Sequence, residues 1–160
     1  MPRTYRVPYN GTITNAGGDT DLLSLQPADD KPVRLKGWSF GQTSESGDAA
    51  EELVRVTIRH MAATVTIGSG GSAVTPTKVD QTDPAAGVTA RANDTTVATT
   101  SGTDTVLEEN AWNIRSSPWE KYIDEPDRPI ARQGEALIVR LESTVADDVS
   151  ANFTFLIEEL

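Results

Sequence analysis

The sequence predicts an all-β fold, an antiparallel β-sandwich with long surface loops and little helix. The main observation is an alternation of apolar and polar residues at period two, which is typical of half-buried strands. In segment 54–58, for example, Val54, Val56 and Ile58 point to one side, while Arg55 and Thr57 point to the other. Turn residues are dense between such segments, and helical periodicity is weak. Closely spaced strands without intervening helices favour a sandwich of antiparallel sheets.

Further segments share this pattern. Alternation extends over 3–9, 137–141 and 153–157, and shorter strands are predicted at 21–25, 33–40, 62–67, 95–98, 104–107, 111–115 and 130–132. About nine strands joined by long connections fit a jelly roll best.

Three segments break the pattern. Residues 46–53 carry the best helix signal, but a β pattern begins directly after them, so we expect a turn leading into a strand. Residues 68–87 are poor in large apolar groups and predict an excursion over the surface. Residues 110–130 hold Trp112, Trp119 and Tyr122 among prolines and predict a long connection that is ordered by packing.

Length and composition restrict the function. The 160 residues fit one domain spanning 1–160, and 14 basic against 24 acidic residues give a net charge of −10. A chain with this negative charge repels nucleic acid and anionic lipid, and we therefore expect neither as a partner. No apolar run is long enough to span a bilayer, and the first residues lack the apolar stretch of a signal peptide. We therefore expect a protein that is made in the cytoplasm of its host cell.

The residues that catalysis needs are scarce. With no cysteine and one histidine, the chain cannot form disulfides, thiolate zinc sites or multi-histidine metal sites. His60 lies at the end of a predicted strand without a Gly-x-Ser-x-Gly motif, and the Gly-rich loop 68–72 lacks the ending of a phosphate loop. The segment 19–21 lacks the ligand spacing of an EF-hand. We expect no enzyme activity, no cofactor and no metal.

Contacts with other proteins are the more promising function. The first twelve residues hold two arginines and no acid, and Pro8 removes a backbone donor, so 1–12 is predicted to be an edge strand or an N-terminal arm. The aromatics of 110–130 either fill the core, form a protein interface or stack on a sugar. Eight residues are interface candidates: Arg3, Tyr5, Arg6, Tyr9, Arg115, Trp119, Tyr122 and Arg128.

Several stretches also carry a family resemblance. They are 27–33, 51–56, 68–72 with Pro76, 94–96, 112–115, 137–141 and 153–155. Together they resemble small structural proteins of tailed phages and, more loosely, the jelly-roll decoration or cement proteins of phage heads. No binding motif accompanies this resemblance, so it transfers no functional residue.

The resemblance implies a non-enzymatic virion protein that binds the major capsid protein on the outer surface of the capsid and stabilises the lattice. Closed symmetry then favours a homo-oligomer, a trimer first of all. Segments 1–12 and 112–130 are the candidates for lattice or subunit contacts. The alternatives are another virion module, such as a head fibre or tail component, and a carbohydrate-binding β-sandwich.

Overall fold

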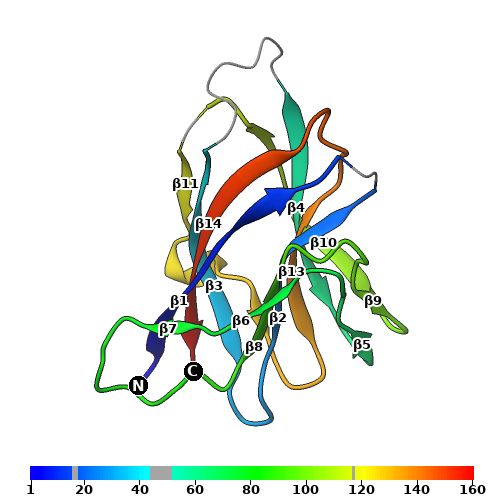
Figure 1. The fold of residues 1–160 in the computed structure, drawn as a ribbon. Helices are drawn as coiled ribbons and strands as arrows, with labels where there is room; N and C mark the ends of the chain where they lie inside the picture. Colours follow the sequence, from blue (N-terminus) through cyan, green and yellow to red (C-terminus); the bar gives the residue numbers. More distant parts are fainter. Residues whose placement is uncertain (16–17, 44–51, 117) are drawn as a thin grey trace.

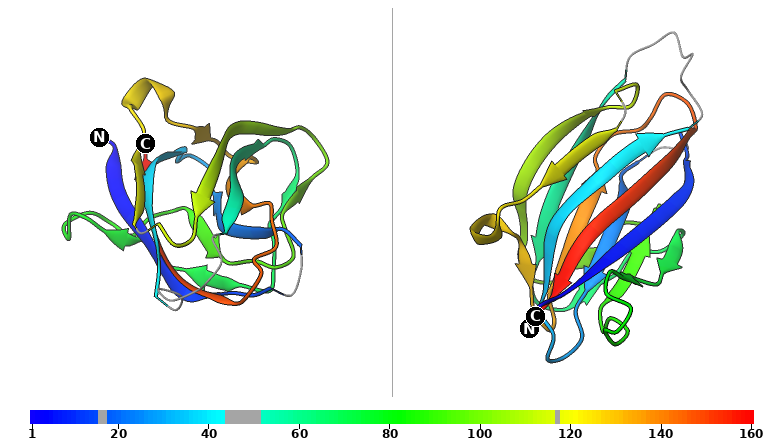
Figure 2. Two further views of the ribbon diagram at one scale, coloured as in Figure 1. Left: turned by 90° about the horizontal axis from the view of Figure 1, so that it is seen from above. Right: turned by 90° about the vertical axis from the view of Figure 1, so that its left-hand side faces the viewer.

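The computed structural model describes residues 1–15, 18–43, 52–116 and 118–160. They form two six-stranded sheets that enclose one core, with every strand pairing antiparallel (Figures 1 and 2). The predicted all-β antiparallel sandwich is confirmed. Sheet A comprises β11 (Trp119–Tyr122), β3 (Val33–Gln42), β14 (Val149–Glu159), β1 (Arg3–Ile13) and β7 (Thr77–Lys78) in that order, with β12 (Ile130–Ala131) also on β3. Sheet B comprises β10 (Asp104–Asn113), β4 (Leu53–Met61), β13 (Ala136–Leu141), β2 (Thr20–Gln26), β8 (Thr89–Ala92) and β6 (Ser72–Val74). A small pair, β5 (Val65–Thr66) and β9 (Thr99–Thr100), and the 3₁₀ turn η1 (Glu125–Asp127) complete the fold.

The strands pair in a nested order. β1 pairs with β14, β2 with β13, β3 with β11 and β12, and β4 with β10. The first strand is thus joined to the last, and the two chain ends lie side by side (Figure 1). Successive strand pairs in this order belong alternately to sheet A and sheet B, so both sheets face the same core.

An aromatic cluster fills one part of that core. Phe40 is fully buried and makes edge-to-face contacts with Trp112, Trp119, Phe153 and Phe155, at centroid distances of 5.1–5.5 Å. These rings come from both sheets, so the contacts join the layers. Edge-to-face aromatic pairs stabilise a core beyond the area that they bury.

The strand boundaries differ from the predicted ones in several places. Segments 104–107 and 111–115 belong mainly to one strand, β10, because a strand at a solvent-exposed edge needs no apolar alternation. Segment 62–67 shortens to β5, and 95–98 holds only an isolated bridge between Ser69 and Thr96. The turn expected over 46–53 lies mostly outside the described residues, and β4 begins at Leu53. The connection expected over 110–130 contains a strand, β11, at its centre.

The excursion after β4 covers part of the outer face of sheet B. Ile138 points away from the main core, yet it is fully buried against Ala98 and Met61, with Val65 and Ile67 packed at the margin. The excursion expected over 68–87 instead adds β6 to the edge of sheet B and β7 to the edge of sheet A. The segments around Val65 and Ala98 form a second, smaller core outside the sandwich.

A buried ion pair lies under the same layer. Arg140 of β13 donates to Asp21 of β2 at 2.6 Å and to the carbonyl of Ala98 at 2.9 Å, while the Ala98 amide donates to Asp21. Asp94 is also buried, and it accepts hydrogen bonds from Arg91 and the Gly71 amide. These contacts attach the excursion to sheet B.

We predict that Arg140→Met lowers the free energy of unfolding by about 3–5 kcal/mol, because it leaves the Asp21 carboxylate buried without its cation. Denaturant titration monitored by circular dichroism measures the change. Arg115→Met, at an exposed position, is the control and should change stability by less than about 0.5 kcal/mol. Equal losses in both variants would contradict the importance of the buried pair.

The outer face of sheet B also carries partly buried ion pairs around Glu142. Arg59 and Thr57 donate to one carboxylate oxygen of Glu142, and Arg55 contacts the other at 2.8 Å. Burial alone raises the pKa of Glu142, but the hydrogen bonds from Thr57 and Arg59 and the charges of both arginines outweigh it. The pKa of Glu142 therefore lies below its ordinary value.

This lowered pKa predicts acid sensitivity. A carboxyl group whose pKa is lower in the folded than in the unfolded state contributes stability above the unfolded pKa, about 4.3 for glutamate. That contribution disappears as the pH falls through the lower, folded-state pKa. We expect Glu142→Gln to reduce the loss of melting temperature on acidification from pH 7 to about pH 3. An unchanged pH dependence in this variant would rule out Glu142 as a contributor.

Candidate functional site

The outer face of sheet A carries the most distinctive surface of the described chain. Along β1 and β14 the side chains alternate, so Val7 and Phe155 point into the core while Arg6 and Leu156 point outward as direct neighbours. The register between β14 and β3 shifts between Leu156 and Ile157, where the pairing passes over Lys36. The bulge places Gly37 opposite both Leu156 and Tyr122.

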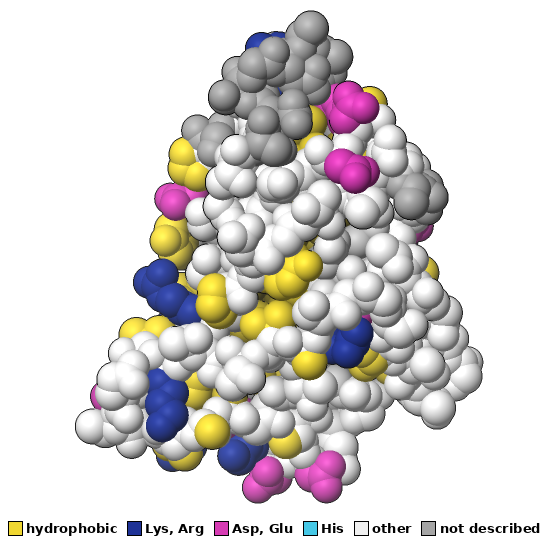
Figure 3. Space-filling view, in the orientation of Figure 1, with side chains coloured by type: hydrophobic (Ala, Val, Ile, Leu, Met, Phe, Trp, Pro, Cys, Tyr) yellow, Lys and Arg dark blue, Asp and Glu magenta, His cyan; other side chains and the backbone are white. Residues whose placement is uncertain are grey.

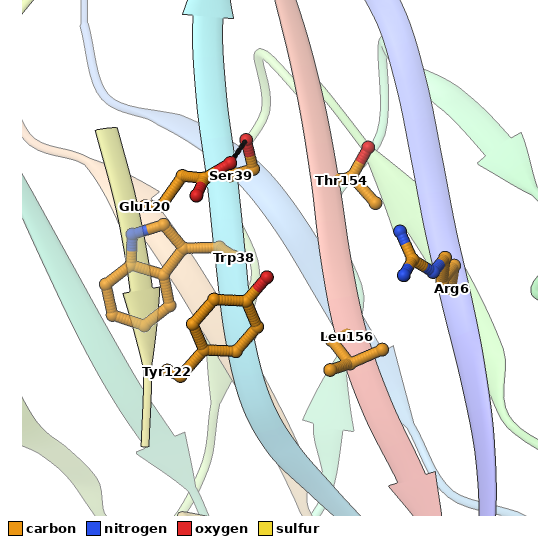
Figure 4. A pocket seen from close by; sticks show the side chains of 7 residues that line it. All are labelled: Arg6, Trp38, Ser39, Glu120, Tyr122, Thr154 and Leu156. Carbon is orange, nitrogen blue, oxygen red and sulfur yellow. Dashed lines mark hydrogen bonds between the residues drawn. The ribbon is translucent and has the colours of Figure 1, made fainter. Parts of the chain in front are cut away.

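A hollow of about 170 Å³ lies over this part of the sheet (Figure 4). Gly37 pairs with two of its lining residues, Leu156 and Tyr122, and an added Cβ on Gly37 would collide with the backbone oxygen of Lys121. Four neighbouring strands contribute the lining residues, which are Arg6, Trp38, Ser39, Glu120, Tyr122, Thr154 and Leu156.

The hollow combines an aromatic ring with polar groups of several kinds. Tyr122 is 72% exposed, and Arg6 is exposed and has no ion-pair partner among the described residues. On the opposite side the Ser39 hydroxyl donates to the Glu120 carboxylate at 3.2 Å. Tyrosine and arginine are the residue types that protein interfaces concentrate at their energetic centres.

A basic cluster of Arg34, Lys36 and Arg128 borders the hollow on the same face. All three cations approach the carboxylate of Glu158, at 3.7, 3.7 and 3.4 Å respectively. Glu158 of β14 is mostly buried, and Thr4 of β1 lies directly opposite it. Three positive charges thus surround one buried negative charge.

Uncharged surface lies beside these groups. Over β1 and β14, the middle of the face shown in Figure 3 carries mainly apolar and uncharged side chains, and charged groups lie toward its margins. The interface candidate Tyr9 does not belong to this surface, because it shares the inward phase of Val7, packs half-buried against the core and stacks on Phe153 at 6.0 Å. This mixture of apolar surface and marginal charge is the composition of many protein interfaces.

The structure brings together three of the eight interface candidates. Arg6 and Tyr122 lie at the hollow, and Arg128 belongs to the basic cluster beside it. Trp119 is half-buried beneath β11 and packs edge-to-face on Trp38 and Phe40, so its main role is in the core.

The other candidates lie elsewhere. Tyr5 is fully buried and donates its hydroxyl to the Pro84 carbonyl, so its prediction as an interface residue is wrong. The reason is its alternation phase, which it shares with Val7. Arg3 pairs with Asp83 at 3.5 Å, and Arg115 is exposed in the turn after β10. Residues 3–12 lie in β1 rather than in a free arm, and beyond Arg6 no described strand pairs with the other side of β1.

Sequence reasoning missed Arg34, Lys36, Glu158 and Leu156. The alternation places all four on the outward side of their strands. The sequence signal that could have found Arg34 and Lys36 is their position as cations at alternate residues of β3. Their approach to Glu158, however, depends on the pairing of β3 with β14, which lies far away in the sequence. A glycine within a predicted strand, such as Gly37, is a local signal of a β-bulge.

The one histidine lies apart from the hollow. His60 contacts Glu135 at 3.1 Å at one end of β4, and no group of three or more His, Asp or Glu side chains suited to a metal ion occurs in the described part of the chain. None of the described helices is long and apolar enough to cross a membrane.

Comparisons with protein-family models, with curated proteins and with solved structures find no match for this chain.

The two aromatic residues of β11 should differ sharply in their effect on stability. Trp119→Ala removes a ring packed against the core and should cost at least about 2 kcal/mol of unfolding free energy. Tyr122→Ala removes an exposed ring and should cost less than about 0.5 kcal/mol. Parallel denaturant titrations test this pair of values, and a comparable loss for both would show that Tyr122 is structural.

Proposed function

We propose that the chain is a non-enzymatic virion structural protein that binds the outer surface of a tailed-phage capsid and stabilises its lattice. It uses the outer face of sheet A to contact the major capsid protein. The observation that carries this proposal is the hollow with Arg6 and Tyr122 at its rim, on a face built from paired strands. Such a rigid surface pays little entropy when it docks.

The fold supports a role in a virion. The nested strand pairing favours a jelly roll, the double-sheet arrangement that occurs in viral capsid domains and in lectins. Fold alone does not determine function. The resemblance of several segments to structural proteins of tailed phages is what directs the proposal toward the capsid.

Charge and symmetry are consistent with this role. A net charge of −10 keeps a protein soluble at high copy number and repels the packaged genome. A symmetric oligomer that engages several capsid subunits at once achieves high avidity from modest individual contacts. A trimer on a threefold lattice position is the arrangement that we propose first.

The test is binding of the purified protein to capsids of the encoding phage that were assembled without it. We expect saturation at a fixed number of copies per lattice position, measured by co-sedimentation and quantitative mass spectrometry. Tyr122→Ala and Arg6→Ala should each weaken binding by about tenfold, the effect of losing a central interface residue. Arg132→Ala, an exposed arginine that is neither an interface candidate nor part of the hollow lining, is the matched control and should bind as the wild type does.

Two outcomes would contradict the proposal. Failure of the wild-type protein to bind such capsids, with a few copies per virion found in the tail, would identify a tail component. Retention on an oligosaccharide array that Tyr122→Ala abolishes, without capsid binding, would identify a carbohydrate-binding sandwich. The hollow has the aromatic ring and hydroxyl groups that such a protein needs.

A further inference from the structure

The basic side chains on the two sheets differ in how many carboxylates pair with them. On sheet B, Arg55 and Arg59 share Glu142 and each has a further acidic partner, Glu109 and Asp104 respectively. Each of these two cations is therefore matched by carboxylate groups. The outer face of sheet A is the opposite case, because its cations outnumber the carboxylates that they contact.

The excess of cations over paired carboxylates lies in the basic cluster. Arg34, Lys36 and Arg128 share Glu158, and the one further carboxylate among their ion pairs is Glu125, 3.7 Å from Arg34. The Glu125 side chain is 74% exposed, so water screens this contact strongly. The side chains of the three cations are only 17–28% exposed, so their charges are less screened than those of free surface arginines.

Neighbouring hydrogen bonds fix two of the cations in place. Lys36 donates to the Thr4 hydroxyl at 3.2 Å, and the Arg128 Nε donates to the Ile123 carbonyl at 3.1 Å. Charged side chains held in this way lose little freedom when they bind a further anion. Arg6, across the strand from Leu156, adds a fourth positive charge between the cluster and the hollow.

The surroundings distinguish between kinds of anion. Asp124, Glu125 and Asp127 are exposed beside Arg128, and Glu120 lines the hollow. A nucleic acid presents an unbroken row of phosphates, which these acids repel. An acidic protein segment can instead place single carboxylates on the cations and an apolar side chain in the hollow.

We infer that the partner surface is an acidic segment of the capsid protein, with a carboxylate bound at the basic cluster and a neighbouring apolar side chain seated in the hollow. This inference rests on the proposed function and names the chemistry of its partner. Attraction at a local patch of opposite charge also determines orientation, because other parts of two acidic proteins repel each other.

Carbodiimide cross-linking of the decorated capsid tests the inference directly. The reagent joins a lysine amine to a carboxylate within contact distance, and mass spectrometry identifies both residues. We expect a cross-link from Lys36 to an Asp or Glu of the capsid protein. The three other lysines, Lys31, Lys78 and Lys121, are internal controls, and the free protein reveals the intramolecular link from Lys36 to Glu158.

Neutralising variants provide a second measurement. Lys36→Gln and Arg128→Gln each leave two cations on Glu158, so the fold should persist, which thermal unfolding verifies. The double variant should bind capsids at least about tenfold more weakly, whereas Lys78→Gln should bind as the wild type does.

The outcomes separate the two proposals. Wild-type binding that depends on Tyr122 but not on Lys36 and Arg128, without a Lys36 cross-link, would overturn the acidic-segment inference alone. Absence of any capsid binding would overturn both proposals. If the wild type binds duplex DNA and the double variant does not, the partner of the basic cluster is a nucleic acid and the acidic-segment inference is wrong.

Discussion

The pairing of β1 with β14 is the constraint on which the rest of the structure depends. It extends over eleven residues of each strand, from Arg3 opposite Glu159 to Ile13 opposite Val149. This register sends the intervening apolar side chains into the core and places Arg6 next to Leu156 on the outer face. A shift by one residue would exchange the two faces and bury the polar side chains. The hollow therefore exists because the two ends of the chain pair in this register.

The two sheets use charge in different ways. On the outer face of sheet B the ion pairs hold elements together, and the pair of Asp21 with Arg140 attaches the excursion after β4 to the sandwich. Buried pairs of this kind cost desolvation, so their main effect is to exclude other arrangements of the covering segment. On sheet A, Arg34 and Lys36 of β3 and Arg128 all pair with the one mostly buried carboxylate of Glu158, so positive charge is in excess there. We interpret the first arrangement as structural and the second as a surface for recognition.

Much of this fold could be predicted from local sequence, because alternation at period two depends only on which side of a strand faces the core. The same reasoning correctly separates Arg6 from the apolar phase of β1, and that phase also explains why Tyr5 is buried. The convergence of Arg34 and Arg128 on Glu158 could not be predicted, since it joins residues from distant parts of the chain. A glycine inside a predicted strand can mark a bulge, but only the pairing of β3 with β14 places Gly37 opposite Leu156 of the hollow lining.

The pairing of β1 with β14 also has a consequence for folding during translation. β1 is synthesised long before its partner β14. During translation the nascent β1 therefore presents an unpaired backbone edge and its apolar side chains, a state prone to aggregation. Closure of sheet A must wait until β14 has left the ribosome, and contacts so far apart in sequence make that step slow.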